Sequence, residues 1–282
     1  MRSTSDVTAV VLAGGKATRM GCEKALISFG GRPLVEHVVA RVRPLAAKVL
    51  VVTSGREGRD SVAFLERPGA VEVVTDLVPR GGPLAGIHAG LVASRAERCV
   101  VVGCDMPFLS APLLAHLAGR LAGADAVVPR MASSGFVEPL AAAYSRSCIS
   151  AIERLLSAGA CRVARLFDEV HVEYVDEGVW RSMDRDGLSF FNINTRGDLA
   201  RATALMGGCP HVLCAWRRDA AVPRVEIRTG CACRASGRGA QGGGGPSRDE
   251  RGEAGDVPVQ PHSPRGPRRR VPCGIRISPG QG

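Results

Sequence analysis

The chain has 282 residues, enough for one large domain or two small ones, and 45% of them are hydrophobic, so a core can form. Aromatic residues make up only 4%, so Val, Leu, Ala and Ile must build that core. The formal net charge is +10, but residues 207–282 hold 13 Arg against six Asp and Glu and carry +7 of it. The basic balance belongs mostly to this C-terminal segment, so we expect no nucleic-acid partner for the rest of the chain.

The sequence gives no sign of a membrane segment or of secretion. No run of about 18 apolar residues occurs, and the apolar stretch in MRSTSDVTAVVLAGG is too short and wrongly flanked for a signal peptide. Five of the ten Cys are scattered through residues 1–206, which is not typical of a disulfide framework. We therefore predict a cytoplasmic protein with no membrane partner, whose Cys are small buried side chains in a reducing compartment.

The first 206 residues alternate short β-rich runs with longer helical patterns. Val7–Leu12 is predicted as a buried strand, and Pro33–Val42 as a helix with Pro in its first turn. Further strands are predicted at Lys48–Thr53, Val71–Thr75, Cys99–Gly103, Ala126–Pro129, Val137–Tyr144 and Val170–Val175. Further helices are predicted at Leu84–Arg95, Ala111–Leu121, Ser147–Ala158, Ala164–Phe167 and Asp198–Met206. This alternation predicts an α/β layer sandwich whose mainly parallel sheet is buried on both faces.

Polar segments follow three of the predicted strands. AGGKATRMG comes after the first strand, Asp76 after the third and Asp105 after the fourth. Ligands of such sheets bind beyond the carboxyl ends of the strands, which meet at one edge. We therefore expect these three segments to lie together at a binding site.

The loop after the first strand has the layout of an anion-binding cradle. Two glycines allow close approach of the backbone, and successive N–H groups can face phosphate oxygens. Arg19 offers a planar fork for bidentate phosphate contacts and Lys24 a point charge. The spacing fits neither a Walker A loop nor G-x-G-x-x-G. Alternatively, both side chains are ordinary solvated cations on a surface loop with no ligand.

Asp105 is the candidate metal anchor, because Mg²⁺ prefers carboxylate and phosphate oxygens. The alternative is a turn or helix N-cap, and Asp76 has the same alternative. Cys104 is interpreted as a packing residue. The sequence contains no recognisable Ser–His or Cys–His nucleophile pair, so no covalent enzyme intermediate is expected.

The composition changes after Met206. Residues 207–282 contain 15 Gly and nine Pro with no periodicity, and such a segment cannot bury enough apolar surface to offset its ordering entropy. We predict a globular domain at residues 1–206 and a disordered tail at 207–282. The Cys209/Cys214 and Cys231/Cys233 spacings do not favour a zinc site. The tail is alternatively a basic interaction arm or a segment translated out of frame.

The glycine loop, L-A-G-G-x-x-x-R-M-G-x-x-K, resembles the signature of nucleotidyltransferases that activate small molecules with nucleoside triphosphates. Later segments resemble the same pattern in order: PLVEHVVARV at 33–42, Asp76 with GGPLAGIHAGL at 81–91, VVGCDMPFLS at 101–110, GFVEPLAAAY at 135–144 and FFNINTRGDL at 190–199. The likeness is closest to the molybdenum cofactor guanylyltransferase family and covers about residues 8–200. The chain departs from the pattern at Gly103, where the family often has Pro, and at Gly-Cys-Glu 21–23 in place of Gly-x-Asp.

The resemblance implies a three-layer, Rossmann-like α/β nucleotidyltransferase fold for residues 1–206. It implies transfer of GMP from GTP to molybdopterin or the molybdenum cofactor, with Arg19, Lys24 and Asp105 as catalytic residues and Mg²⁺ on Asp105. Arg19 and Lys24 are then expected to contact the β- and γ-phosphates of the nucleotide. Implied nucleotide-binding positions are Leu12, Ala13, Gly14, Gly15, Arg19, Lys24, Thr53, Asp76, Gly82, Leu84, Gly86 and Asp105. Implied acceptor-side positions are Glu138, Asn192 and Asn194.

Three alternatives stay open. Gly15 favours GTP over CTP, because in the nucleotidyltransferases that this chain resembles the guanine-using branch tends to have L-A-G-G in this loop and the cytosine-using branch L-A-A-G. Asn192 and Asn194, placed on a possible strand ahead of the N-cap residue Thr195, alternatively serve capping and turn hydrogen bonds. The function is alternatively that of a relative using CTP or another phosphorylated acceptor, or of a non-catalytic nucleotide-binding protein. Further partners implied by the family are molybdenum insertion proteins and apo-molybdoenzymes.

Overall fold

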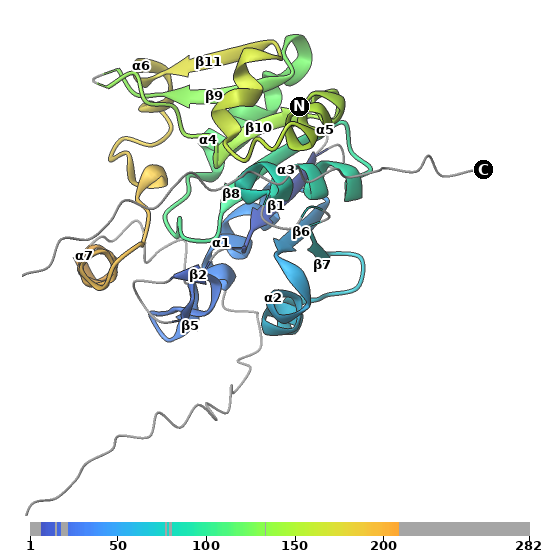
Figure 1. Ribbon diagram of the computed structural model, residues 1–282. Coiled ribbons are helices and arrows are strands. Elements are labelled where there is room, and N and C mark those ends of the chain that lie inside the picture. Colours follow the sequence, from blue (N-terminus) through green and yellow to red (C-terminus); the bar gives the residue numbers. More distant parts are fainter. Residues whose placement is uncertain are drawn as a thin grey trace, which may run out of the picture. The chain divides into compact units, whose positions relative to one another are not determined.

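A computed structural model describes residues 7–208 apart from 15, 18–21, 77, 79, 80 and 133. Its main sheet has seven strands in the order β11-β9-β10-β8-β1-β6-β7 (Figure 1). The strands are β1 Val7–Leu12, β6 Lys48–Thr53, β7 Val71–Thr75, β8 Arg98–Gly103, β9 Ala126–Arg130, β10 Ala141–Ser145 and β11 Val172–Asp176. All pairs are parallel except those of β10 with β8 and β9. The predicted mainly parallel α/β fold is confirmed.

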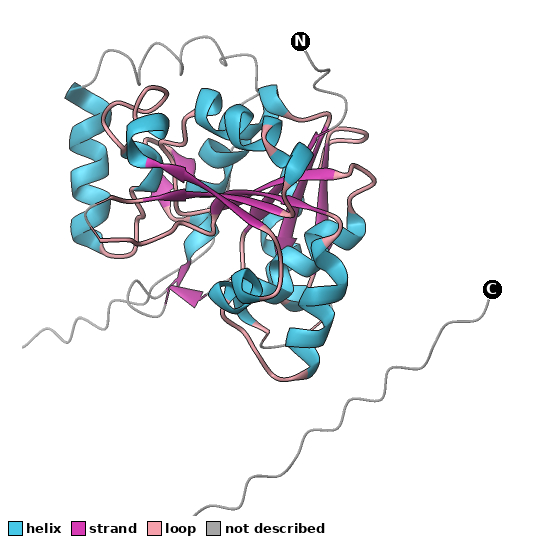
Figure 2. Cartoon of the chain, turned by 90° about the horizontal axis from the view of Figure 1, so that it is seen from above, coloured by secondary structure: helices cyan, strands magenta, loops and turns pink. Residues whose placement is uncertain are grey.

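Helices cover both faces of this sheet, so the fold has three layers (Figure 2). One face carries α1 Leu34–Val42, α2 Gly55–Val62 and α4 Ala111–Gly119. The other carries α3 Gly82–Ala93 and α5 Cys148–Ser157. All six residues of β1 are buried, and its apolar side chains divide between the two core clusters, with Val11 facing α1 and Val10 facing α3. This burial explains the nearly continuous Val and Leu of the strands.

Helix α3 lies unusually close to the central strand. Every residue from Leu84 to Leu91 is buried, because the helix is enclosed between the sheet and α5. A Cβ added at Gly90 would lie 2.9 Å from Val10 Cγ2 and nearer still to Cγ1. Glycine at this position is therefore what allows the helix backbone to approach the strand.

A third, smaller core cluster ties the last described helix, α7 Arg196–Gly208, to the segment that follows the glycine loop. Phe108 lies between Phe29 and Phe191, with its ring centroid 5.9 Å from each and edge-to-face geometry. Ile193 and Ala202 are fully buried in the same cluster. Two distant parts of the sequence are thus packed together beside the sheet.

Several short elements were not predicted. They are the antiparallel strand pairs β2 Lys16–Ala17 with β3 Cys22–Glu23 and β4 Ser28–Phe29 with β5 Arg32–Pro33, the helices α2 and α6 Glu177–Trp180, and 3₁₀ turns at Lys24–Leu26, Arg43–Leu45, Ala63–Leu65, Leu121–Gly123 and Leu188–Phe190. Predicted helix Ala164–Phe167 is a 3₁₀ segment at Val163–Asp168. Helix α2 escaped prediction because GREGRDSV has two glycines and one buried side chain, Val62.

Two predicted strands differ from the structure. The strand predicted at Val137–Tyr144 begins only at Ala141, because the Leu140 N–H donates to Glu138 Oε1 (3.1 Å) in a turn before it. The expectation that Asn192 and Asn194 lie on a strand is wrong, since the segment is irregular and leads into α7. Its backbone is held by single hydrogen bonds rather than by a ladder.

The Cys prediction holds for three side chains of the described region. Cys99, Cys104 and Cys148 are buried free thiols. The prediction is wrong for Cys161, which is exposed because it lies in the turn region after α5. From position 209 onward the predicted tail lies outside the described residues, and so do Cys209, Cys214, Cys231 and Cys233. Within the described ranges, none of the helices has the length and apolarity needed to cross a bilayer.

Candidate active site

The candidate site lies at the carboxyl edge of the four adjacent parallel strands β8, β1, β6 and β7. Backbone bonds continue past the strand ends: Ala13 N donates to Val52 O (2.7 Å), Cys104 N to Leu12 O (3.1 Å) and Asp76 N to Thr53 O (2.8 Å). These bonds align the ends of the neighbouring strands, so the loops that follow them begin side by side. The predicted gathering on one edge holds for Asp76, Asp105 and the start of the glycine loop at Ala13 and Gly14.

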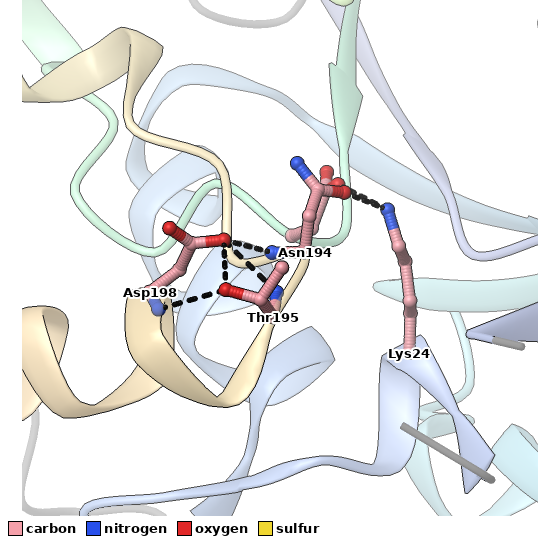
Figure 3. A network of polar contacts seen from close by, with 5 residues as sticks. Lys24, Asn194, Thr195 and Asp198 are labelled. Carbon is pink, nitrogen blue, oxygen red and sulfur yellow. Dashed lines mark hydrogen bonds and ion pairs between the residues drawn. The ribbon is translucent and has the colours of Figure 1, made fainter. Parts of the chain in front are cut away.

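Lys24 joins three segments of this edge. It begins a 3₁₀ turn after the glycine loop, and its Nζ lies 2.9 Å from Asp105 Oδ2. The same ammonium donates to Asn194 Oδ1 (Figure 3). The side chains of Lys24 and Asp105 are 25% and 16% exposed, so the pair is partly buried yet reachable from solvent. The structure therefore brings a cation, a carboxylate and an amide together from positions far apart in the sequence.

Asp105 takes its place directly after β8. A Cβ at Gly103 would lie 2.7 Å from Asp105 Oδ1, so the glycine gives the carboxylate room to fold back over the strand end. Burial, reinforced by the charge of Asp105, raises the pKa of the neighbouring Cys104 thiol to about 12. Cys104 therefore stays protonated and packs in the core, as the sequence predicted.

The second half of the edge is polar and lies over β6 and β7. Ser54 Oγ donates to Asp76 Oδ2 (3.0 Å), and a Cβ on Gly14 would lie 2.8 Å from Ser54 Oγ. Ser54 was missed from the sequence, although its place directly after a strand of the same edge was a usable signal. Thr53 is fully buried, and its hydroxyl donates to Val74 O (3.5 Å). Ser54 is thus exposed and Asp76 partly exposed at this half of the edge, while Thr53 is buried beneath them.

The remaining candidates for nucleotide contact lie around the start of α3. The side chains of Leu12 and Leu84 are buried in the core, and a Cβ on Gly86 would lie 3.1 Å from Leu12 Cδ2. Gly86 therefore serves the packing of α3 on β1. Gly82 has φ +63° and faces the Cys161 carbonyl. Backbone contact of these residues with a nucleotide stays a prediction.

Two predicted site residues, Gly15 and Arg19, lie outside the described residues.

The predicted acceptor-side residues come together next to Asp105. Glu138 is only 7% exposed, accepts the Leu140 N–H and lies near Asn192. Burial raises its pKa, the nearby charge of Asp105 adds to that effect, and the Asn192 side chain lowers the pKa slightly. Ile193 N donates to Asp105 O (2.9 Å) while its side chain is buried, so the flanking Asn192 and Asn194 lie toward Glu138 and Lys24.

The side chains present can be tested for a fit to a divalent cation. Asp105 offers a carboxylate and Asn194 an amide oxygen, side by side around Lys24 Nζ. Within the described ranges, no group of three His, Cys, Asp or Glu side chains is placed to hold a metal ion. Mg²⁺ is commonly bound through one or two carboxylates and completed by substrate phosphates. The donor set therefore fits Mg²⁺ that takes its other ligands from a triphosphate.

A three-layer α/β fold with a cation and a carboxylate beside a glycine loop at one sheet edge is the arrangement of a protein that binds a phosphorylated nucleotide. Residues 9–173 match the family model described as the MobA-like NTP transferase domain. The chain belongs to this family, as the sequence predicted.

Three relatives show the extent of the likeness. A probable molybdenum cofactor guanylyltransferase of Pelotomaculum thermopropionicum is 37% identical over 198 residues, 70% of this chain and 92% of the relative. The molybdenum cofactor guanylyltransferase of Desulfosudis oleivorans is 33% identical over 201 residues, 70% of this chain and 95% of the relative. The crystal structure of molybdopterin-guanine dinucleotide biosynthesis protein A from Archaeoglobus fulgidus has a TM-score of 0.63 and 32% identity, covering 72% of this chain and all of its own.

Proposed function

We propose that this chain transfers GMP from GTP to the phosphate of molybdopterin or of its molybdenum-loaded form, releasing pyrophosphate. The observation that carries the proposal is the Lys24–Asp105 pair, joined by Asn194, at the carboxyl edge beside the glycine loop. The names of the relatives, guanylyltransferases of the molybdenum cofactor, support the choice of GTP and of the acceptor. The product would be a guanine dinucleotide cofactor.

Nucleotidyl transfer requires that the α-phosphorus be aligned with the nucleophile and that charge on the leaving pyrophosphate be stabilised. The Lys24 ammonium supplies a positive charge to phosphate oxygens, and its two partners fix its position. Asp105, with Asn194, would hold Mg²⁺, which when bound neutralises charge on the triphosphate. Arg19, by the sequence prediction, would contact the β- and γ-phosphates.

The acceptor needs no general base. A phosphate monoester has a second pKa near 6 and carries about two charges at neutral pH, so its oxygen is already a nucleophile. That oxygen attacks the α-phosphorus, the bond to the β-phosphate oxygen breaks, and pyrophosphate leaves with the electron pair. This balance agrees with the expected direct transfer, in which Cys104 stays a protonated packing residue.

The two halves of the edge would divide the substrates between them. Gly14, Ser54 and Asp76, over β6 and β7, would contact the nucleoside of GTP. Glu138 and Asn192, beyond Asp105, would line the acceptor side. The cytoplasm is the proposed compartment, and molybdenum insertion proteins and apo-molybdoenzymes are the proposed further partners.

The test follows pyrophosphate and dinucleotide product from GTP, CTP and ATP with Mg²⁺ and molybdopterin. We expect GTP-selective product, and Asp105→Asn should lower kcat by about 100-fold to 1,000-fold, the usual cost of losing one transition-state electrostatic contact. Glu72→Gln is the matched control, because it removes an exposed carboxylate that is paired with Lys48 away from the site. Its kcat should equal that of the wild type.

Other results would each contradict part of the proposal. Selectivity for CTP would contradict the choice of GTP as the substrate but leave the proposed transfer mechanism in place. GTP binding without turnover would mean another phosphorylated acceptor or a non-catalytic nucleotide-binding protein. Equal losses in Asp105→Asn and Glu72→Gln would show that the carboxylate at position 105 has no special part in the reaction.

A further inference from the structure

The segment that carries Asn194 is locked to the start of α7 by one carboxylate. Asp198 Oδ2 accepts the N–H groups of Asn194 (3.1 Å) and Thr195 (2.9 Å) and the Thr195 hydroxyl (2.9 Å) (Figure 3). Asp198 N in turn donates to Thr195 Oγ1 (3.1 Å), and Leu199 N donates to Thr195 O (3.1 Å). Thr195 is therefore the N-cap residue, and Asp198 completes a reciprocal capping arrangement.

One bond in this arrangement exceeds what capping requires. A capping box joins the N-cap residue and the residue three positions later, and satisfies helix-end donors. Here the carboxylate also holds the N–H of Asn194, the residue before the N-cap. The side chain of that same residue accepts the bond from Lys24 Nζ. A helix cap is thus connected through a single residue to the ammonium at the centre of the site.

The other side of Asn194 is also fixed. Ile193 N donates to Asp105 O (2.9 Å), and the Ile193 side chain is fully buried in the third cluster. The backbone around Asn194 is therefore fixed at two points: the preceding Ile193 N–H donates to Asp105 O, and the Asn194 N–H donates to Asp198 Oδ2. Removing Asp198 would release one of these two anchors while leaving the Lys24–Asp105 ion pair in place.

We propose that Asp198 is a positioning residue that acts through Asn194 to hold Lys24 beside Asp105. Its side chain binds backbone and hydroxyl groups of its own segment, so it belongs to the support of the site rather than to substrate contact. The catalytic consequence rests on the proposed function: kcat should fall in its absence while KM for the nucleotide changes little. The structural consequence, a freer Lys24, does not depend on the reaction.

The test measures how fast a small amine-reactive reagent modifies Lys24 in the full chain, read by mass spectrometry, because modification requires the amine to leave its hydrogen bonds. Asp198→Ala, Asn194→Ala and the double variant are compared with the wild type. Asp198→Ala releases Asn194 and so weakens one hydrogen bond to Lys24, that from Nζ to Asn194 Oδ1, which should speed the modification about threefold to tenfold. Asn194→Ala should do the same, and the double variant should show no further increase, because the two residues act in series.

Two further variants separate positioning from general loosening of α7. Thr203→Ala removes a hydroxyl of the same helix that donates to Leu199 O (2.8 Å), and it should leave the modification rate unchanged. Asp198→Asn keeps an acceptor oxygen and the side-chain shape, so it should fall between the wild type and Asp198→Ala. It also keeps the test decisive if the alanine variant fails to fold.

The outcomes are distinct. An unchanged modification rate in both Asp198 variants, or a double variant whose rate is the product of the single effects, would overturn the proposal. An equal increase in Thr203→Ala would do so as well. Absence of GMP transfer by the wild-type chain would instead overturn the proposed function, and the modification rates would still decide the role of Asp198.

Discussion

Gly90→Ala tests the close approach of α3 to the central strand. The new methyl group would lie 2.9 Å from Val10 Cγ2 and closer to Cγ1, well inside ordinary contact distance. Val10 cannot move aside easily, because it is fully buried in β1 and its β-branched side chain is stiff at χ1. The helix or the strand must therefore shift.

Two opposing terms set the magnitude. Overpacking a buried site costs about 1–3 kcal/mol. Replacing an interior helical Gly by Ala gains about 1 kcal/mol of helix propensity. For contacts this short we expect the upper part of the overpacking range to apply, with a net loss of up to about 2 kcal/mol in the free energy of unfolding.

Gly119→Ala is the matched control. A Cβ there would meet no atom of the described residues within 4 Å, so this helical Gly in α4 should show only the gain, up to about 1 kcal/mol. The free energies come from urea unfolding monitored by circular dichroism, compared at equal m-values. A Gly90→Ala variant as stable as Gly119→Ala would show that α3 is not held against β1 as described.

Three further predictions follow from the same structure. Burial lowers the pKa of His37 to about 4, so the unfolded chain takes up the proton at a higher pH than the folded chain does. The free energy of unfolding should therefore fall by about 3 kcal/mol as the pH drops from 6.5 toward 4. In His37→Gln, the free energy of unfolding measured across this pH range should lack that decrease. Ser54→Ala removes the bond to Asp76 Oδ2 and should raise KM for the nucleotide about threefold to tenfold with little change in kcat, whereas an unchanged KM would remove Ser54 from the nucleotide side. A chain ending at Gly208 should retain full transfer activity, since relatives are matched over 92–95% of their length by 70% of this chain, and a large loss of kcat would assign the tail a role.

The sheet and its edge could be predicted because the signal is local. Runs such as Val7–Leu12 are apolar at every position, which indicates strands buried on both faces, and parallel strands bring their carboxyl ends to one side. The proximity of Asp76, Asp105 and the glycine loop follows from topology alone. Helix α2 carried a weaker signal, because its sequence is polar and contains two glycines.

The contact between Lys24 and Asn194 could not be predicted from spacing. It joins residues 170 positions apart and depends on the packing of Phe29, Phe108 and Phe191, which no periodic pattern connects. The double use of the Asp198 carboxylate was hidden for a related reason. A T-x-x-D spacing predicts a cap, but not a bond to the residue before it.

The third cluster has a consequence for the order in which the working protein appears during synthesis. Lys24 and Asp105 leave the ribosome early, and every strand of the sheet has been made by Asp176. Asn194 and the apolar face of α7 come later, so a nascent chain can hold its sheet while the site still lacks its last member. The same holds for a chain that ends between Trp180 and Leu188: it would contain every strand of the sheet but lack Asn194, one of the two partners of Lys24.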